Sequence, residues 1–342
     1  MNFLLIPLSI IFGLITSIRN ILFDIGFLNS KSFKIPVICV GNLNVGGTGK
    51  TPHTEYLFKI LKEKYTIAIV SRGYKRKNYN FSYVNTDSHY QNVGDEPLMF
   101  KRKNPEAIVV VCGDRTKAMN KITTDYPKVD VILLDDGFQH RWVNAGLNLL
   151  LTNVNNPFYN DYHLPYGNLR ENKNQCKRAD HIIITNNTDK TNEDYKRDIK
   201  SRISKFSKKE CSFSKITYNN AKALFNKEQI VDLKDFNIVL VTGIADTSSL
   251  INYLQNKTTI DRHFEFKDHH NFNKENVNTI LSCYNSLKSI KKLILTTEKD
   301  SVKLLQYEEK FKDIAIYYLP IEIKFTNQEK FDKKILEYVK QY

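Results

Sequence analysis

Strand-length apolar segments alternate with helical patterns along most of this chain, and this alternation is its strongest constraint on the fold. The strand-length segments from Ile35 onward are "IPVICV", "TIAIV", "AIVVV", "VDVILLDD", "LNLLLT" and "HIIIT", and helical patterns occupy 51–64, 95–103 and 114–124. Strands that are apolar at nearly every position are buried on both faces, and helical connections make neighbouring strands parallel. The sequence therefore predicts an α/β protein with a parallel sheet covered by helices on both faces.

A second α/β set follows a lysine-rich segment over 189–209. It starts with "CSFSKITY", which we interpret as a hinge strand, and continues through "FNIVLVTGIA", "IDRHFEF", "KLILTT" and "IAIYYLPIEI", with helical patterns over 247–255 and 274–289 and at the end. A length of 342 residues suffices for two domains with separate cores. We expect a first domain over 31–205 and a second, smaller one over 206–342.

The segment "NVGGTGKT", from Asn44 to Thr51, lies between the first strand and the first helix. It matches the phosphate-loop pattern GxxxxGK[ST] except that Asn44 replaces the first glycine, and asparagine tolerates positive φ better than most residues. A nucleotide-free glycine turn is the alternative, but strand, loop and helix occur in the required order. The sequence predicts a P-loop NTPase-like domain whose nucleotide-binding residues are Asn44, Val45, Gly46, Gly47, Thr48, Gly49, Lys50 and Thr51.

A metal partner for this loop is expected at the end of a neighbouring strand. Lys50 would reach the β and γ oxygens, and Thr51 would bind Mg²⁺. Asp135 and Asp136 close the strand "VDVILLDD", and because side chains alternate along a strand, one of them faces the metal. The sequence leaves open which one. ATP is favoured over GTP by elimination, because neither "TTEKD" nor "NNTD" fits the guanine-specific pattern.

The first thirty residues are unusually apolar, with no charge from Asn2 to Ile18. A secretory signal would need a positive start and a small-residue cleavage site, which are not seen here. The segment is a little short for a membrane span and contains Pro7 and Gly13. We expect residues 1–30 to form a membrane-associating helix that dips into the bilayer interface. A true span and a helix docked on the core remain alternatives.

The net charge decides little by itself, whereas the cysteines argue against two kinds of site. The net charge of +14 suits nucleic acid, an anionic membrane or phosphorylated substrates, but no nucleic-acid-binding signature accompanies it. Five scattered cysteines without a CxxC pair argue against a disulfide framework or a zinc site. We therefore expect no nucleic acid partner and a chain that works in a reducing compartment.

Several motifs occur together in one order along about 260 residues. They are "VGNLNVGGTGKTP", "SRGY", "VGDEP", "DRTKA", "DDGFQHR", "LPYGNLRE", "FKDHH" and "TTEKD". With them the chain resembles the tetraacyldisaccharide 4'-kinases, the lipid A 4'-kinases of Gram-negative bacteria. That family also begins with a membrane-associating apolar helix.

The resemblance implies transfer of the ATP γ-phosphate to the 4'-hydroxyl of an acylated glucosamine disaccharide 1-phosphate, with lipid IVA as product. It implies a protein that is peripheral or monotopic on the cytoplasmic face of the bacterial inner membrane, with no obligate protein partner. It supports Asp95 as the base, although Asp95 also fits a helix N-cap. It favours His269 as the partner of Asp95, with His270 as the rival, so that the second domain completes the site on closing.

Four further residues are candidates for acceptor or nucleotide contacts. We assign Arg72 and Arg115 to anionic groups, because guanidinium pairs bidentately with phosphate. Glu96 and Glu171 are expected to position sugar hydroxyls or amides, and a surface ion pair is the alternative for each of the four. Two other functions remain open, namely a membrane-tethered NTPase switch acting on a protein partner and a kinase of a soluble acceptor.

Overall fold

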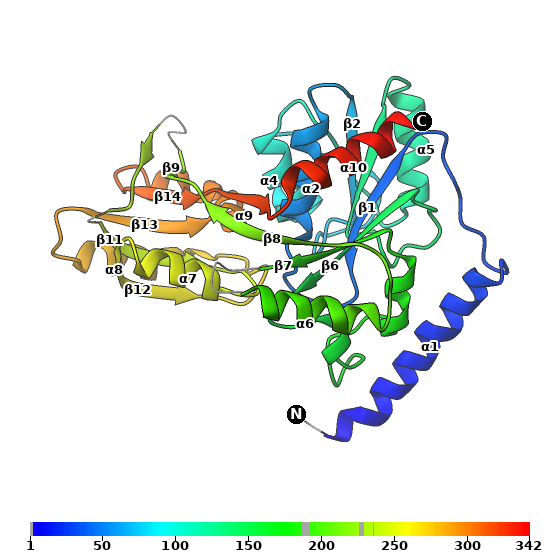
Figure 1. Cartoon of the computed structure of the whole chain (residues 1–342). Helices are drawn as coiled ribbons and strands as arrows, with labels where there is room; N and C mark the ends of the chain where they lie inside the picture. The colour runs from blue at the N-terminus through cyan, green and yellow to red at the C-terminus, as the bar shows by residue number, and fades with distance from the viewer. Residues whose placement is uncertain (1–2, 187–191, 226–228, 235) are drawn as a thin grey trace.

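A computed structural model describes residues 3–186, 192–225, 229–234 and 236–342. The helices in Figure 1 are α1 (Ile6–Asp24), α2 (Lys50–Leu61), α3 (Tyr90–Val93), α4 (Asp95–Lys103), α5 (Arg115–Asp125), α6 (Glu193–Ser204), α7 (Ser248–Gln255), α8 (Lys274–Ser286), α9 (Glu298–Leu304) and α10 (Gln328–Lys340). The strands are β1 (Val37–Asn42), β2 (Ile67–Ser71), β3 (Ser82–Tyr83), β4 (Ile108–Val111), β5 (Val131–Asp135), β6 (Leu147–Asn153), β7 (His181–Thr185), β8 (Cys211–Tyr218), β9 (Ala221–Ala223), β10 (Ile230–Val231), β11 (Asn237–Thr242), β12 (Thr259–Glu265), β13 (Lys292–Thr297), β14 (Ile316–Leu319) and β15 (Ile321–Phe325). Short 3-10 helices occupy Phe3–Leu5, Phe158–Asn160, Lys173–Arg178 and Leu305–Lys310.

The described strands form two sheets, as the sequence predicts. The larger has the order β15-β8-β7-β6-β1-β5-β2-β4-β3 and is parallel from β8 to β4, with antiparallel edges. One core on this sheet includes side chains of α2, α4 and α10, and the core on the other face includes α5 and α6. This arrangement confirms the predicted α/β fold with helices on both faces.

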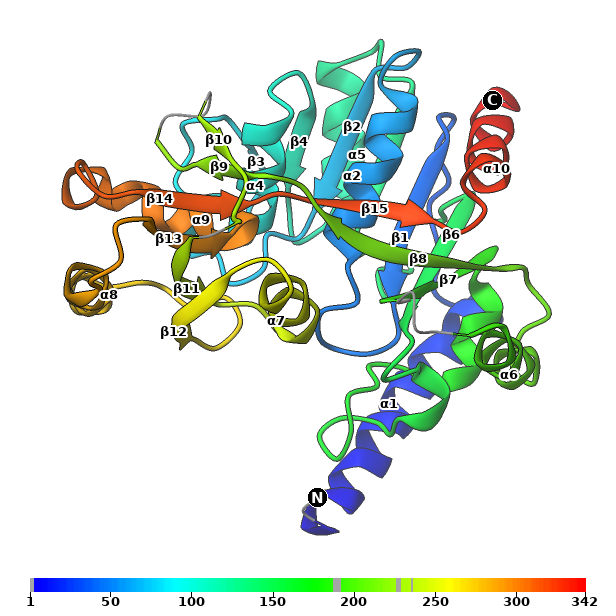
Figure 2. The same cartoon turned by 60° about the vertical axis from the view of Figure 1, so that its left-hand side comes forward.

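The smaller sheet has the order β10-β9-β14-β13-β11-β12 and is also covered on both faces. Side chains of α7 pack on one face, and those of α8 pack on the other. Figures 1 and 2 show this sheet as a separate lobe beside the first. Each sheet therefore has a hydrophobic core on both of its faces.

The segment "IAIYYLPIEI" connects the two sheets, although its sequence reads as a single strand. Its first half forms β14 in the smaller sheet, and after Pro320 its second half forms β15, which pairs antiparallel with β8. Proline has no N–H to donate, which suits the point where one ladder ends and the next begins. The predicted hinge strand β8 is likewise paired within the larger sheet. The predicted division at residue 205 stays a prediction, and strand pairing assigns β8 and β15 to the larger sheet.

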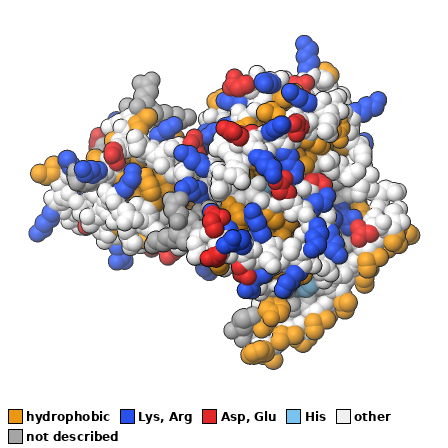
Figure 3. Space-filling view, in the orientation of Figure 1, with side chains coloured by type: hydrophobic (Ala, Val, Ile, Leu, Met, Phe, Trp, Pro, Cys, Tyr) orange, Lys and Arg blue, Asp and Glu red, His pale blue; other side chains and the backbone are white. Residues whose placement is uncertain are grey.

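Helix α1 projects from the larger domain, as Figures 1 and 2 show. Its buried positions are Ser9, Gly13, Thr16, Asn20 and Phe23, spaced by three or four residues, so they form one narrow stripe. The remaining faces carry exposed leucine and isoleucine, which Figure 3 shows as an apolar band along the helix. Within the described residues, Phe3–Asp24 is apolar and long enough to cross a membrane, with 17% of its most apolar window buried.

Candidate active site

The glycine-rich loop lies where β1, a central strand, ends and α2 begins. Gly46 and Gly49 have φ values of 109° and 80°, a backbone region that side chains disfavour. A Cβ on Gly47 would lie 3.3 Å from the Cβ of Ala245, which belongs to the loop after β11 of the smaller sheet. The loop therefore presents bare backbone at a helix N-terminus, the usual cradle for phosphates.

Asn44 does not have the left-handed backbone that its replacement of a glycine suggested. Among the described residues other than glycine, positive φ occurs at Lys75, Asp136, Asn186 and His269. Asn44 is buried, and its Nδ2 donates to Asp161 Oδ2 at 2.6 Å. Its side chain therefore fastens the loop to the segment around Asp161, which is the physical reason for asparagine at this position.

Lys50 and Thr51, the first residues of α2, point toward the carboxylates at the end of β5. Lys50 Nζ lies 3.3 Å from Asn42 Oδ1 and 3.8 Å from Asp136 Oδ1. Thr51 Oγ1 lies 3.0 Å from Asp135 Oδ2 and 3.2 Å from Glu96 Oε2. The structure thus brings together the predicted phosphate and metal residues, and it adds Glu96 to them.

The two neighbouring aspartates have opposite electrostatic environments. Burial, together with Glu96 and Asp136, raises the pKa of Asp135 to about 7. Burial also acts on Asp136, but the charges of Lys50 and Arg170 outweigh it and hold the pKa of Asp136 well below its usual range. Arg170 Nη2 lies 2.9 Å from Asp136 Oδ1. Among the described residues, Asp136 therefore has ion pairs with Lys50 and Arg170, whereas no ion pair to Asp135 is found.

Asp95, the first residue of α4, is buried beside a histidine from the smaller domain. Its Oδ2 lies 2.9 Å from His269 Nδ1, and Gly94 rather than Asp95 occupies the N-cap position of the helix. His270 turns away, with Nε2 2.9 Å from Asn276 Oδ1. His269 also has a φ of 58°, a costly backbone for a non-glycine residue that often marks a functional position.

Helix α9 of the smaller domain supplies two lysines to the same pair. Lys299 Nζ lies 3.0 Å from His269 Nε2 and 3.0 Å from Glu96 Oε1, and Lys303 Nζ lies 3.5 Å from Asp95 Oδ2. Burial would raise the pKa of Asp95, but the hydrogen bond from His269 and the charges of Lys299 and Lys303 hold that pKa well below its usual range. Sequence reasoning missed Lys299, although the motif "TTEKD" contains it.

The candidate acceptor residues separate into two environments. Arg115 is buried, with Nη2 3.4 Å from the Asp136 backbone oxygen, and burial lowers its pKa from the ordinary value. The Arg72 guanidinium lies 5.3 Å from the centre of the Tyr79 ring. Both follow strands of the larger sheet at the edge that carries the phosphate loop.

Glu171 has a structural environment that its sequence position did not reveal. Its side chain is fully buried, and it pairs with Arg19 of α1 and with Arg178. Asn20 Nδ2 donates to the same carboxylate at 3.2 Å. The adjacent Arg170, which was not among the predicted site residues, contacts Asp136 and Asn42 instead. The structure therefore places Glu171 between α1 and the site, where its carboxylate already has partners.

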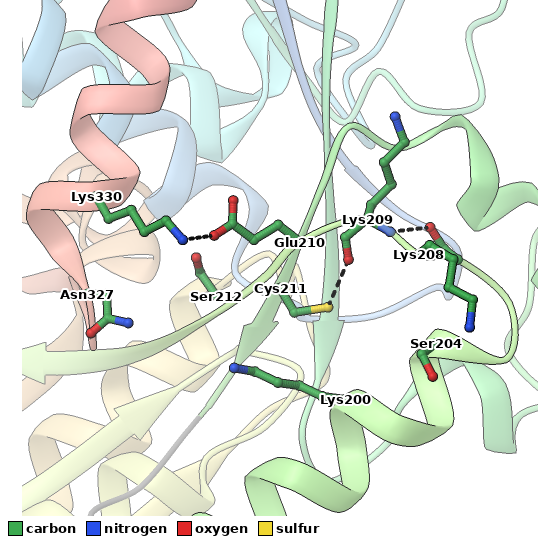
Figure 4. A pocket seen from close by; sticks show the side chains of 10 residues that line it. Lys200, Ser204, Lys208, Lys209, Glu210, Cys211, Ser212, Asn327 and Lys330 are labelled. Carbon is green, nitrogen blue, oxygen red and sulfur yellow. Dashed lines mark hydrogen bonds and ion pairs between the residues drawn. The ribbon is translucent and has the colours of Figure 1, made fainter.

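A separate basic pocket of about 330 Å³ lies between α6, β8 and α10 (Figure 4). Lys330 pairs there with Glu210, and Cys211 has a thiol whose pKa is raised to about 11 by burial. None of the predicted site residues lines this pocket; its lining residues are Lys200, Ser204, Ser207, Lys208, Lys209, Glu210, Cys211, Ser212, Asn327 and Lys330. The described residues also contain no group of three or more His, Cys, Asp or Glu side chains placed to hold a metal by themselves.

Known proteins match this chain over nearly its whole length. The family model described as Tetraacyldisaccharide-1-P 4'-kinase matches residues 1–340. The tetraacyldisaccharide 4'-kinase of Flavobacterium psychrophilum is 43% identical over 99% of this chain and 98% of its own. That of Bacteroides thetaiotaomicron is 38% identical over 98% of this chain and 93% of its own. The crystal structure of LpxK from Aquifex aeolicus in complex with ATP superposes with a TM-score of 0.77 at 29% identity, covering 98% of each chain.

Proposed function

Because this chain belongs to the tetraacyldisaccharide-1-P 4'-kinase family and is a kinase of lipid A biosynthesis, we propose that it phosphorylates the 4'-hydroxyl of an acylated glucosamine disaccharide 1-phosphate with ATP, forming lipid IVA. One observation carries the proposal. The Thr51 hydroxyl lies 3.2 Å from Glu96, and the neighbouring Asp95 is paired with His269 from the other domain. A phosphate-binding loop and a candidate base are therefore in adjacent positions.

Lys50 and the loop amides bind the β and γ phosphates in this proposal. The residues around Thr51 fit Mg²⁺, because the Thr51 hydroxyl and the Asp135 carboxylate lie 3.0 Å apart, and burial together with Glu96 and Asp136 raises the pKa of Asp135. Mg²⁺ commonly takes one or two carboxylates and completes its shell with phosphates and water, so a larger protein cage is not required. When bound, the ion supplies charge neutralisation at the β and γ oxygens.

We assign the metal contact to Asp135 rather than Asp136. Asp136 is held by Arg170 and lies near Lys50, so it positions these two cations toward the phosphates. Glu96 lies between Thr51 and Lys299, so its part is on the metal side of the site rather than at a sugar hydroxyl.

The oxygen of the 4'-hydroxyl bonds to the γ-phosphorus of ATP, and the bond between that phosphorus and the ADP oxygen breaks. Asp95 accepts the proton that the 4'-hydroxyl loses. Lys299 donates to His269 Nε2, so that Nδ1 carries the proton that is donated to Asp95. Asp95 is a weak base in this arrangement, since its pKa is low, and proton transfer is therefore late. Because His269 and Lys299 come from the smaller domain, closing of the two domains completes the site and excludes water.

Arg72 and Arg115 bind anionic groups of the nucleotide or acceptor.

Helix α1 lies in the cytoplasmic leaflet of the inner membrane as a peripheral or monotopic anchor, since its outward faces are apolar along their length. The acceptor is itself a membrane lipid, so this placement brings the sugar to the candidate active site without full extraction of its acyl chains.

Thin-layer analysis of a lipid extract incubated with the protein and γ-labelled ATP tests the proposed function. We expect one labelled lipid that depends on added Mg²⁺ and on the disaccharide acceptor, and no label with Lys50→Met. Slow ATP hydrolysis without any labelled lipid, stimulated by a protein fraction, would indicate a membrane-tethered NTPase switch instead. Label on a water-soluble sugar would indicate a kinase of a soluble acceptor.

A further inference from the structure

The buried stripe of α1 includes a polar contact with the body of the protein near the C-terminal end of the helix. Glu171, whose side chain has no exposed surface, pairs with the Arg19 guanidinium and accepts from Asn20 Nδ2 at 3.2 Å. Arg141 Nη1 also donates to the Asn20 backbone oxygen at 2.9 Å. An anchor that only held the protein to a bilayer would not need buried ionic contacts with the catalytic domain.

The residue next to Glu171 reaches the phosphate loop. Arg170 contacts both Asp136 oxygens, at 2.9 Å and 3.3 Å, and it also donates to Asn42. Asn42 in turn accepts from Lys50 Nζ at 3.3 Å and donates from Nδ2 to Thr48 Oγ1 at 2.8 Å. Arg170 is therefore one contact away from the lysine that binds the phosphates.

A second connection joins the same residues. Gln139 Nε2 donates to the Asn42 backbone oxygen at 2.8 Å and lies 3.5 Å from Glu171 Oε2. Loss of the cation at Arg19 would remove one hydrogen-bond donor from the buried carboxylate of Glu171. A buried carboxylate that loses a donor is destabilised, so its side chain or the neighbouring donors change position. The contacts of Arg170 and of Gln139 with Asn42 would then both change, since Gln139 lies beside Glu171 and Arg170 precedes it in the chain.

We propose that Arg19 and Asn20 of α1 are positioning residues for phosphoryl transfer, acting through Glu171 and Arg170 on Asn42 and Lys50. The seating of the membrane helix and the geometry of the phosphate loop are thereby coupled. The proposal rests on the proposed role of Lys50 at the phosphates. Helix α1 thereby has a second function besides anchoring, because turnover depends on how the helix packs against the larger domain.

Steady-state kinetics of Arg19→Met in detergent micelles with saturating acceptor, together with vesicle flotation, tests this coupling. Methionine keeps an unbranched side chain that fills the place of the arginine stem but cannot pair with Glu171. We expect kcat to fall about tenfold or more, since small displacements in a phosphoryl-transfer site are costly. The KM for the acceptor and the vesicle-bound fraction should stay at wild-type values. Arg19→Lys should recover part of kcat, because it restores a cation.

Arg197→Met is the matched control, since it removes an exposed guanidinium that pairs with Asp194 on α6. It should keep the wild-type kcat. If Arg19→Met does not fold, Asn20→Ala removes one donor and keeps the cation, and its kcat should fall in the same direction.

A wild-type kcat in the folded Arg19 or Asn20 variant would overturn the coupling. So would a loss that appears in the acceptor KM and follows vesicle binding, because that is the result of an anchor alone. A wild-type protein that labels no lipid contradicts the proposed function instead, so the two failures are distinguishable.

Discussion

The imidazole of His269 lies 2.9 Å from the carboxylate of Asp95, although 174 residues separate them in the chain. One belongs to the loop after β12 in the smaller domain, and the other begins α4 in the larger. Lys299 lies on the far side of the ring, 3.0 Å from Nε2, so Lys299, His269 and Asp95 form a row of three groups. A site assembled in this way is complete only while the two domains are together.

Replacing the candidate base should reduce turnover without affecting nucleotide binding. Asp95→Asn keeps the shape of the side chain and removes the proton acceptor, so we expect kcat to fall about 100-fold or more. The ATP dissociation constant should stay within about twofold, because Asp95 pairs with His269 and not with the loop. Asp261→Asn, an exposed change on β12, is the control. Near-wild-type kcat in Asp95→Asn at saturating acceptor would exclude the assigned role.

Removing the cation behind His269 should also lower kcat. Lys299→Met loses the donor at Nε2 and the partner of Glu96, so the histidine tautomer is no longer fixed, and we expect a loss of about tenfold or more. Lys310→Met removes an exposed lysine that donates to the exposed Asn278 and serves as control. Equal kcat values for the Lys299 and Lys310 variants would contradict the assignment.

The raised pKa of Asp135 predicts a pH-dependent effect on stability. The ordinary carboxyl pKa is 3.8, and the folded value is about 7, so ionisation of Asp135 destabilises the folded state increasingly between about pH 4 and 7 and fully above. Asp135→Asn should therefore raise the melting temperature in EDTA more at pH 8 than at pH 5. We expect a gain on the order of a few kcal/mol in the free energy of unfolding at pH 8.

The same variant should lose the stabilisation that Mg²⁺ and ATP give to the wild type. Thermal unfolding with and without Mg·ATP at pH 8 measures both effects. An identical difference in melting temperature between the variant and the wild type at pH 5 and pH 8 would show that the folded protein does not raise the pKa of Asp135.

The outer face of α1 should determine membrane binding. Leu14, Ile15 and Ile18 are 57%, 62% and 57% exposed, and replacing all three with glutamine removes apolar surface worth about 3 kcal/mol or more in a bilayer. We expect vesicle partitioning to fall about 100-fold. Ile290→Gln is the control, since Ile290 is fully exposed outside the helix. Unchanged flotation of the triple variant would contradict the proposed anchor.

Local chemistry explains how much of the fold was predictable. Helix α4 begins and ends at the predicted residues, Asp95 and Lys103, because periodicity and a glycine before the first turn are read from neighbouring residues. The phosphate loop and the strand before the two aspartates were predictable for the same reason, since neighbouring residues define both patterns. The single predicted strand "IAIYYLPIEI" instead divides between two sheets, since only distant strands decide which edge each half joins.

The sequence by itself determined the element types, the nucleotide loop, the family and the candidate carboxylates, because residue type and spacing control these locally. Only the tertiary structure decided that His269 rather than His270 meets Asp95, and that Asp135 rather than Asp136 stands beside Thr51. It also buried Glu171 against α1, where the sequence suggested a sugar contact. Consecutive residues point in different directions, so their partners depend on long-range packing, and no local pattern encodes that packing.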